Sequence, residues 1–256
     1  MNLAKTVFIG ETVFEIIKEA KGAAVVMVQR HYSYLSGPTA NRAIDEADLF
    51  ARNYSGEEPS VLFLCDKAGI EQGWKHGEII AKSGLKDINI IASHQGRGPD
   101  SGLRISEGYH EVTDKWLPVS CHRAVDYPIY NYQPARTAIA EDKDPMVAKW
   151  LKGLRPSLIK SDTPESFRGR VAGFVQTLLK QGGITLITTH FELCVLIHTI
   201  YVEGEDLRGT PEEYVPPKGG GILLIDRGKE YDPAAYDYDV NFIITKAWSD
   251  RFYQDH

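Results

Sequence analysis

Short apolar segments alternate with longer helical patterns along most of this chain, and that alternation is the strongest constraint on its fold. The segment AAVVMVQ at 23–29 is apolar up to its final glutamine, as expected of a strand covered on both faces. Strands alternating with helices predict an α/β fold, a three-layer α/β/α sandwich whose central sheet is mostly parallel. Further strand-like runs occur at 88–92, 184–188, 222–225 and 242–245, and helical patterns at 11–20, about 69–82, 164–180 and 193–202.

Two stretches interrupt the alternation. The chain of 256 residues has the size of one large α/β domain, and its 43% hydrophobic content supports a sizeable core. Residues 112–162 are rich in proline and tyrosine (VDYPIYNYQPARTA) and then acidic. Long irregular segments inside a compact domain are usually lids or insertions, so we expect a single domain over 1–256 with an inserted cap at about 112–162. The stretch 203–221 predicts a second long loop.

Charge and cysteine content argue against several classes of protein. The net charge is −6 and no Lys/Arg run forms a basic stripe, which disfavours nucleic acid as a partner. A phosphorylated small molecule is compatible with this charge, because net charge does not describe one cleft. Cys65, Cys121 and Cys194 form neither a disulfide framework nor a zinc motif, so reduced thiols in the cytoplasm are expected. No apolar stretch reaches membrane-spanning length, and we expect no membrane partner.

Histidine and arginine side chains follow three of the predicted strands. Arg30 and His31 end the first run, the segment SHQGR (93–97) follows the second, and Thr189-His190 follows the third. Taken singly, such a histidine is more often a hydrogen-bonded structural residue, and such an arginine is more often in an ion pair. Open α/β sheets, however, bind ligands at the carboxyl ends of their strands. The sequence therefore predicts that two histidines and two arginines share one crevice.

This set of side chains suits phosphoryl transfer. A neutral imidazole can attack phosphorus, and the phosphohistidine formed is labile enough for water to cleave it. The guanidinium groups of Arg30 and Arg97 can hold phosphoryl oxygens in a bidentate manner, and a protonated His190 adds a further donor. Positioning and electrostatics dominate such a reaction. We therefore expect His31 to be the nucleophile, with no metal ion and no cofactor.

The order of these segments resembles the histidine phosphatase superfamily, which includes the cofactor-dependent phosphoglycerate mutases. VVMVQRHYSY is similar to the family's strand ending in Arg-His-Gly, and ITLITTHFE to its strand ending in Thr-His-Gly. LCDKAGIEQGWKHG is similar to its Leu-Thr-x-x-Gly-x-x-Gln-Ala helix, SHQGRGPDSG to its Ser-x-x-x-Arg-Ala-x-Gln-Thr-Ala turn, and PESFRGRVAGFVQTLL to its Glu-Ser…Arg-Val helix. These matches follow one another from about residue 23 to residue 225.

The resemblance implies hydrolysis of a small phosphomonoester through a phosphohistidine at His31. Ser33 either contacts the phosphate or is a turn hydroxyl bonded to backbone, and Asn41 matches the family's phosphate-loop asparagine in a loop that is a few residues longer. Two other functions stay open on the same fold, namely a non-catalytic phosphate-binding signalling module and a phosphomutase. The residues that the resemblance implies around the phosphate are Arg30, Arg97 and His190.

The chain departs from the family pattern at three points. Tyr32 and Phe191 replace the glycines that follow the two histidines, so their rings either line an altered substrate pocket or leave the site inactive. The family's general acid has no carboxylate at the matching position, because the spacing falls near Cys121 and His122. The nearest candidate acid is Asp126, and the alternatives are Glu111 and Glu192. Each of these carboxylates is also compatible with a solvated surface position.

Overall fold

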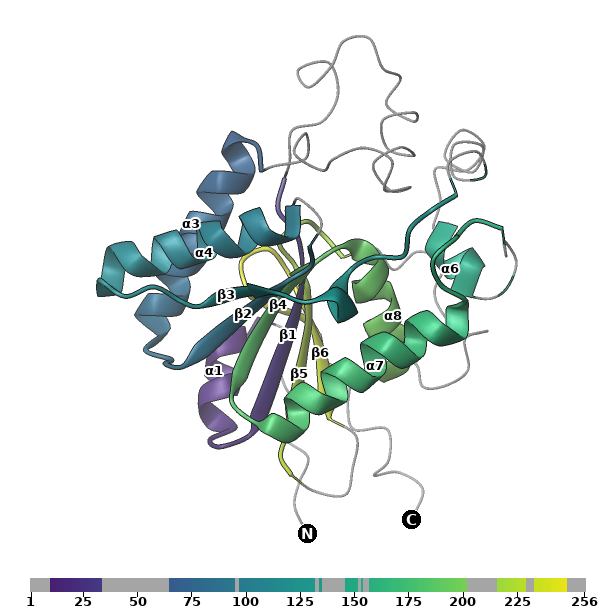
Figure 1. The fold of residues 1–256 in the computed structure, drawn as a ribbon. Helices are drawn as coiled ribbons and strands as arrows, with labels where there is room; N and C mark the ends of the chain where they lie inside the picture. The colour runs from purple at the N-terminus through teal and green to yellow at the C-terminus, as the bar shows by residue number, and fades with distance from the viewer. Residues whose placement is uncertain are drawn as a thin grey trace.

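A mixed β-sheet forms the centre of the fold in the computed structural model of this chain (Figure 1). The structure describes residues 10–33, 65–94, 97–131, 134, 146–151, 153, 157–201, 216–228 and 233–247. Among these residues the sheet has seven strands, in the order β3-β2-β4-β1-β5-β6-β7. Their bounds are β1 Ala24–Arg30, β2 Ile88–Ala92, β3 Val119–Cys121, β4 Ile184–Thr189, β5 Gly221–Asp226, β6 Ala234–Tyr238 and β7 Ile244–Ala247.

The two halves of the sheet differ in their pairing. β1 pairs in parallel with β4, β4 with β2 and β2 with β3, whereas β5, β6 and β7 are added by antiparallel pairs. The expected α/β class is thus confirmed, and the parallel pairs are gathered in the half that carries the histidines. The strand expected at 242–245 starts later, as β7, because Phe242 occupies a turn with a positive φ of 60°.

Helices cover both faces of this sheet (Figure 1). The alternation of side chains along β1 separates two cores, because Val25 and Met27 contribute to one cluster of buried residues and Val26 and Val28 to the other. The fold is therefore a three-layer α/β/α sandwich. The core that contains Val25 and Met27 also includes α1 (Val13–Glu19), α3 (Lys67–Ser83) and α4 (Arg97–Thr113). The core that contains Val26 and Val28 includes α6 (Met146–Leu151), α7 (Pro164–Gln181) and α8 (Phe191–Tyr201).

Local signals define the ends of these helices. Thr12 and Thr163 form capping boxes at the starts of α1 and α7, and Asp66 caps α3 by accepting a hydrogen bond from the N–H of Gly69. Gly84 ends α3 in the left-handed conformation that glycine adopts without strain. In the described part of the chain, no helix is both long enough and apolar enough to cross a membrane.

Helix α4 is the element that the sequence pattern does not predict. Residues 97–101 were expected to form a turn, and Gly98, Pro99, Gly102 and Gly108 all disfavour a helix. The structure shows why the glycines are tolerated. A Cβ atom on Gly108 would lie 1.9 Å from the carbonyl oxygen of Trp74, so only a glycine lets α4 pack this closely on α3.

The stretch 112–162, expected to form a cap, contributes in part to the central layers. It contains the end of α4 and the edge strand β3, followed by a short 3-10 turn at Arg123–Val125. Trp150 of α6 is 1% exposed and belongs to the core beneath α7 and α8. Residues 132–133 and 135–145 lie outside the described residues, and the inserted cap stays a prediction.

Candidate functional site: a histidine and arginine cluster at three strand ends

Three parallel strands end side by side at the edge of the sheet where the histidines lie. The register pairs Arg30 of β1 with Thr189 of β4, and Ala92 of β2 with Thr188 of β4. The backbone N–H of His31 donates to the carbonyl oxygen of Thr189 at 2.7 Å, which extends this pairing past the end of β1. The two histidines are consequently neighbours, with ring centroids 5.2 Å apart.

His31 is held in the form that a nucleophile requires. Its Nδ1 lies 2.7 Å from the carbonyl oxygen of Tyr32, and a carbonyl only accepts, so Nδ1 carries the ring proton. Burial lowers the pKa of His31 well below its usual range, and the nearby charges of Arg97, His190 and Arg30 lower it further. The imidazole is therefore neutral at physiological pH, and Nε2 is its unprotonated nitrogen.

Two arginines supply positive charge around this ring. Arg97, the first residue of α4, is 1% exposed. Arg30 is half-buried, and its guanidinium donates to the carbonyl oxygen of Pro216 at 2.9 Å. Helices α4 and α8 both begin at this edge of the sheet, so the positive ends of their dipoles add to the field. Such a cluster attracts an anion.

His190 is held from both sides between β4 and α8. Its Nε2 lies 3.1 Å from Oγ of Ser93, the residue that follows β2. The ring of Tyr127 meets it edge-on, with centroids 4.4 Å apart. Thr189 fixes the backbone before it by donating to the carbonyl oxygen of Val125 at 2.8 Å. His190 is thus oriented by two other segments of the chain, the one at Ser93 and the one at 125–127.

Glu192 is the buried carboxyl group of this site. It lies in the first turn of α8 and is 0% exposed, and Tyr130 donates to its Oε1 at 3.1 Å. Burial raises the pKa of Glu192 to about 7, against the opposing influence of Arg97 and Arg30. A carboxyl group with this pKa carries its proton in mildly acidic solution and loses it around neutral pH, which suits a general acid.

The other two candidate acids have different surroundings. Asp126 accepts a hydrogen bond from the backbone N–H of His94 at 2.6 Å, and its carboxylate also lies 3.2 Å from the His94 ring, which is largely exposed. Asp126 is thus tied to the loop after β2. Glu111 is exposed near the far end of α4, fourteen residues after Arg97, which corresponds to about 20 Å along the helix.

Of Ser33 and Asn41, the two residues expected near the phosphate, the structure describes only Ser33. The hydroxyl of Ser33 donates to Oδ2 of Asp66 at 2.7 Å, so it helps to tie the loop after His31 to the start of α3. The expected alternative, a turn hydroxyl bonded to backbone, differs from this contact because the partner is a side-chain carboxylate. Asn41 lies outside the described residues.

The two aromatic replacements point into different surroundings. Tyr32 is fully buried, and its hydroxyl lies 2.8 Å from Nδ1 of His76 in α3, so its ring belongs to the support beneath His31. Phe191 is half-buried at the start of α8, and the Arg30 guanidinium carbon lies 5.7 Å from its ring centre. Of the two, Phe191 is the residue whose ring lies near the Arg30 guanidinium.

Sequence reasoning missed Lys218, Tyr130 and His76. Burial lowers the pKa of Lys218, and the charges of Arg30 and Arg97 lower it further, which places its ammonium in their electrostatic range. The turn that carries it is attached to β1, since the N–H of Gly219 donates to the carbonyl of Arg30 at 3.0 Å. Nothing in the local sequence marks these residues, because their partners come from distant segments.

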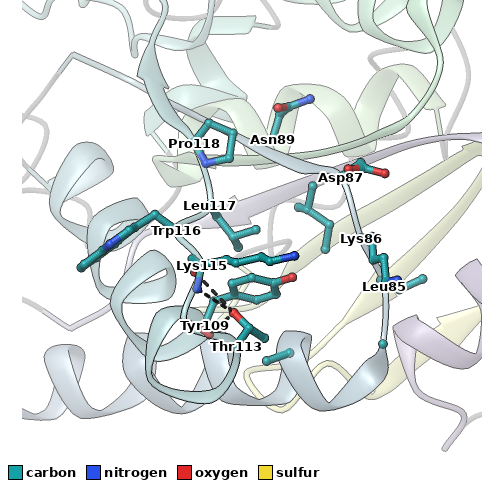
Figure 2. Close-up of a pocket in the computed structure, with 13 residues that line it drawn as sticks. Leu85, Lys86, Asp87, Asn89, Tyr109, Thr113, Lys115, Trp116, Leu117 and Pro118 are labelled. Carbon is teal, nitrogen blue, oxygen red and sulfur yellow. Dashed lines mark hydrogen bonds between the residues drawn. The ribbon is translucent and has the colours of Figure 1, made fainter.

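A separate cavity of about 450 Å³ opens at the other end of β2 (Figure 2). It lies between the end of α3 and the segment after α4, and its rim includes Lys86, Lys115 and Trp116. No residue that the sequence singled out for chemistry lines it. Within the described ranges, no group of three or more His, Cys, Asp or Glu side chains is placed to hold a metal ion.

Comparison with known proteins gives matches in structure alone. No protein-family model matches the sequence, and no curated protein matches it. A putative alpha-ribazole-5'-P phosphatase from Escherichia coli superposes with a TM-score of 0.52 at 14% identity, covering 88% of this chain and 97% of that chain. Phosphoglycerate mutase from Bacillus anthracis superposes with a TM-score of 0.55 at 10% identity, with coverages of 88% and 97%.

A mycobacterial glucosyl-3-phosphoglycerate phosphatase superposes with a TM-score of 0.53 at 12% identity, covering 88% of this chain and 98% of that chain. These proteins are similar to the present chain along nearly their whole length, although few residues are shared. The resemblance inferred from the order of the motifs is thereby confirmed at the level of architecture. The chain has the fold of the histidine phosphatase superfamily.

Proposed function

We propose that this protein is a phosphatase that hydrolyses a small phosphomonoester through a phosphohistidine at His31. One observation carries the proposal. A buried, neutral histidine has its Nδ1 proton held by the Tyr32 carbonyl, so Nε2 is its unprotonated nitrogen, and Arg97 and His190 lie near the ring. An imidazole fixed in this tautomer is a nucleophile, and the positive groups around it stabilise the charge of a transferring phosphoryl group.

The reaction follows from this geometry in two balanced steps. Nε2 of His31 forms a bond to phosphorus while the bond to the leaving oxygen breaks, and that oxygen takes the proton of Glu192. Water then attacks the phosphohistidine, gives a proton to the Glu192 carboxylate, and releases phosphate as the P–N bond breaks. Arg97, Arg30 and His190 bind the non-bridging oxygens through both steps.

The assignment of the acid to Glu192, instead of Asp126, rests on burial. A pKa of about 7 keeps Glu192 protonated at pH 5–6, and the residue deprotonates as the pH rises through 7. Because His31 is already neutral in this range, activity with a poor leaving group should be greatest in mildly acidic solution. Above pH 7 it should fall about tenfold for each pH unit.

The buried acid also favours an enzyme over a phosphate-binding signalling module. A module that only binds phosphate needs cationic side chains and no proton donor. A protonated Glu192 among the cations can instead give its proton to a leaving group. The proposed substrate is a phosphorylated small molecule, for which Lys218 adds a further positive charge. Cys65, Cys121 and Cys194 are free thiols, and we propose a cytoplasmic location.

The proposal is tested by the dependence of rate on the leaving group, measured in EDTA because protein side chains are proposed to supply the positive charge. Glu192→Gln should lower kcat/KM for an alkyl phosphate by about 100-fold or more, and much less for p-nitrophenyl phosphate, whose leaving group needs no proton. The decline above pH 7 should disappear in this variant.

Asp126→Asn is the matched control, and it should change both substrates by a similar small factor. A larger selective loss with Asp126→Asn would assign the acid to that residue. If wild-type protein hydrolysed neither substrate between pH 5 and 8, the proposed function would be wrong.

A further inference from the structure

Tyr32 connects the proposed nucleophile to a second buried histidine, His76 of α3. The Tyr32 carbonyl accepts a hydrogen bond from Nδ1 of His31 at 2.7 Å, and the Tyr32 hydroxyl lies 2.8 Å from Nδ1 of His76. The backbone N–H of Tyr32 donates to Oγ of Ser101 at 3.2 Å. Every polar group of this fully buried residue is therefore engaged, each by a different segment of the chain.

The hydrogen bonds beyond Tyr32 have a definite direction. Nε2 of His76 bonds to the carbonyl oxygen of Val240, which only accepts, so Nε2 carries the ring proton. Burial lowers the pKa of His76 to about 4, so the ring is neutral at physiological pH and its Nδ1 accepts from the Tyr32 hydroxyl. A chain of donors thus runs from Tyr32 through His76 to the turn that follows β6.

The ring of Tyr32 occupies a slot formed by two glycines. A Cβ atom on Gly73 of α3 would lie 2.8 Å from Cε2 of Tyr32, and one on Gly219 would lie 3.0 Å from its Cδ1. Phe242 packs against the far side of His76, with ring centroids 4.2 Å apart. The side chain is therefore confined along both ring edges and at its hydroxyl.

We propose that Tyr32 and His76 are positioning residues for His31. The confined ring holds the backbone of residue 32 in place, so its carbonyl keeps the proton on Nδ1 of His31 and leaves Nε2 directed at the phosphoryl group. A glycine in this position, as in the family pattern, provides the same carbonyl but no side chain to hold it. The inference rests on the proposed function, because it assigns these residues to the orientation of the proposed nucleophile.

The kinetic test separates positioning from general stability. Tyr32→Phe keeps the ring in its slot and removes only the hydroxyl, and it should lower kcat for p-nitrophenyl phosphate about five- to tenfold with KM within about twofold of wild type. His76→Phe should have a similar effect. Because both changes break the hydrogen bond between Tyr32 and His76, the double variant should lose less than the sum of the two single losses. His76→Asn, which offers an acceptor near Nδ1, should recover part of the rate.

A matched control keeps loss of stability from mimicking this result. Ser106→Ala, on α4, removes a buried hydrogen bond that involves neither Tyr32 nor His76. In that bond Oγ of Ser106 donates to the carbonyl oxygen of Leu117 at 2.8 Å. It should lower the midpoint of thermal unfolding and leave kcat unchanged. If Tyr32→Phe does not fold, His76→Phe gives the same test from the other end of the hydrogen bond.

Long-range ¹H–¹⁵N NMR of the full chain provides a readout independent of activity. Wild-type His31 should show a protonated Nδ1 and an unprotonated Nε2, and Tyr32→Phe and His76→Phe should shift it toward a mixture of tautomers. Folded variants with wild-type kcat and an unchanged His31 tautomer would overturn the proposal. If the wild type proved inactive on all phosphoesters, the proposed function would fail separately, and the spectra would still decide the positioning role.

Discussion

Tyr32 follows His31 and Phe191 follows His190, and the two histidines end neighbouring strands, yet the aromatic side chains have opposite surroundings. Tyr32 enters the core between α3 and β5, where glycines make room and His76 binds its hydroxyl. Phe191 begins a helix, half-buried, and its ring faces the guanidinium of Arg30. An aromatic residue in place of the family's glycine therefore packs into the core beside His31 at one strand end and faces the Arg30 guanidinium at the other.

The comparison also separates what each region contributes to the reaction. The His31 region contains the proposed nucleophile and the Tyr32 carbonyl that accepts its Nδ1 proton. The His190 region provides a donor and, two residues later, the buried carboxyl of Glu192, which the helix start places among the cations. Loss of the His31 imidazole should therefore affect all phosphate esters alike, whereas loss of the Glu192 carboxyl should depend on the leaving group.

The largest expected effect is at the nucleophile. His31→Ala should lower kcat about 1,000-fold or more for both alkyl and aryl phosphates, since the attacking nitrogen is lost whatever the leaving group. Acid-labile phosphate bound to wild-type protein after rapid quenching should be absent from this variant. Unfolding by urea should show that the variant is folded. Near-normal turnover by folded His31→Ala would contradict the covalent mechanism.

How much of this could be predicted from the sequence differs between the two regions. The strand ends carrying His31 and His190 follow from apolar runs that any parallel sheet requires, so their convergence was foreseeable. Helix α4 was hidden because Gly98, Gly102 and Gly108 serve close packing, which local propensity does not register.

The residues that support the site could not be predicted from the sequence. His76 is a lone histidine within a helical pattern, and its partners Tyr32 and Val240 lie 44 and 164 positions away. Glu192 was one carboxylate of three, and only its burial against Tyr130 distinguishes it from Asp126. Pairings of this kind depend on tertiary contacts, for which a single sequence has no local pattern.

An intermediate effect is expected at Gly73, which makes the slot for Tyr32. In Gly73→Ala the new methyl group would lie 2.6 Å from Cβ of Arg104 and 2.8 Å from the Tyr32 ring. The clash should outweigh the better helix propensity of alanine and lower the free energy of unfolding by about 1–2 kcal/mol, measured in urea.

The matched control for this clash is Gly169→Ala on α7, where nothing lies within 4 Å of the added methyl group. It should be neutral or stabilising by up to about 1 kcal/mol. Adding Tyr32→Ala to Gly73→Ala should cost less than the sum of the two single changes, because it removes one of the two clashes. If the two changes in the free energy of unfolding were simply additive, Gly73 would not form the slot for Tyr32.

The smallest effect is expected at Phe191, where the ring acts on Arg30 without a hydrogen bond. Phe191→Leu keeps an apolar side chain of similar size at the start of α8 and removes the aromatic face that lies 5.7 Å from the guanidinium carbon. A cation–π contact at a partly exposed site contributes about 0.5–1 kcal/mol, so KM for p-nitrophenyl phosphate should rise about two- to fivefold while kcat changes little. Arg30 would keep its hydrogen bond to the Pro216 carbonyl, and for that reason the loss stays modest. Phe191→Tyr, which retains the ring, should restore the KM. A fall in kcat as large as that of Tyr32→Phe would show that both aromatic residues position the reacting groups, and the contrast between the two regions would disappear.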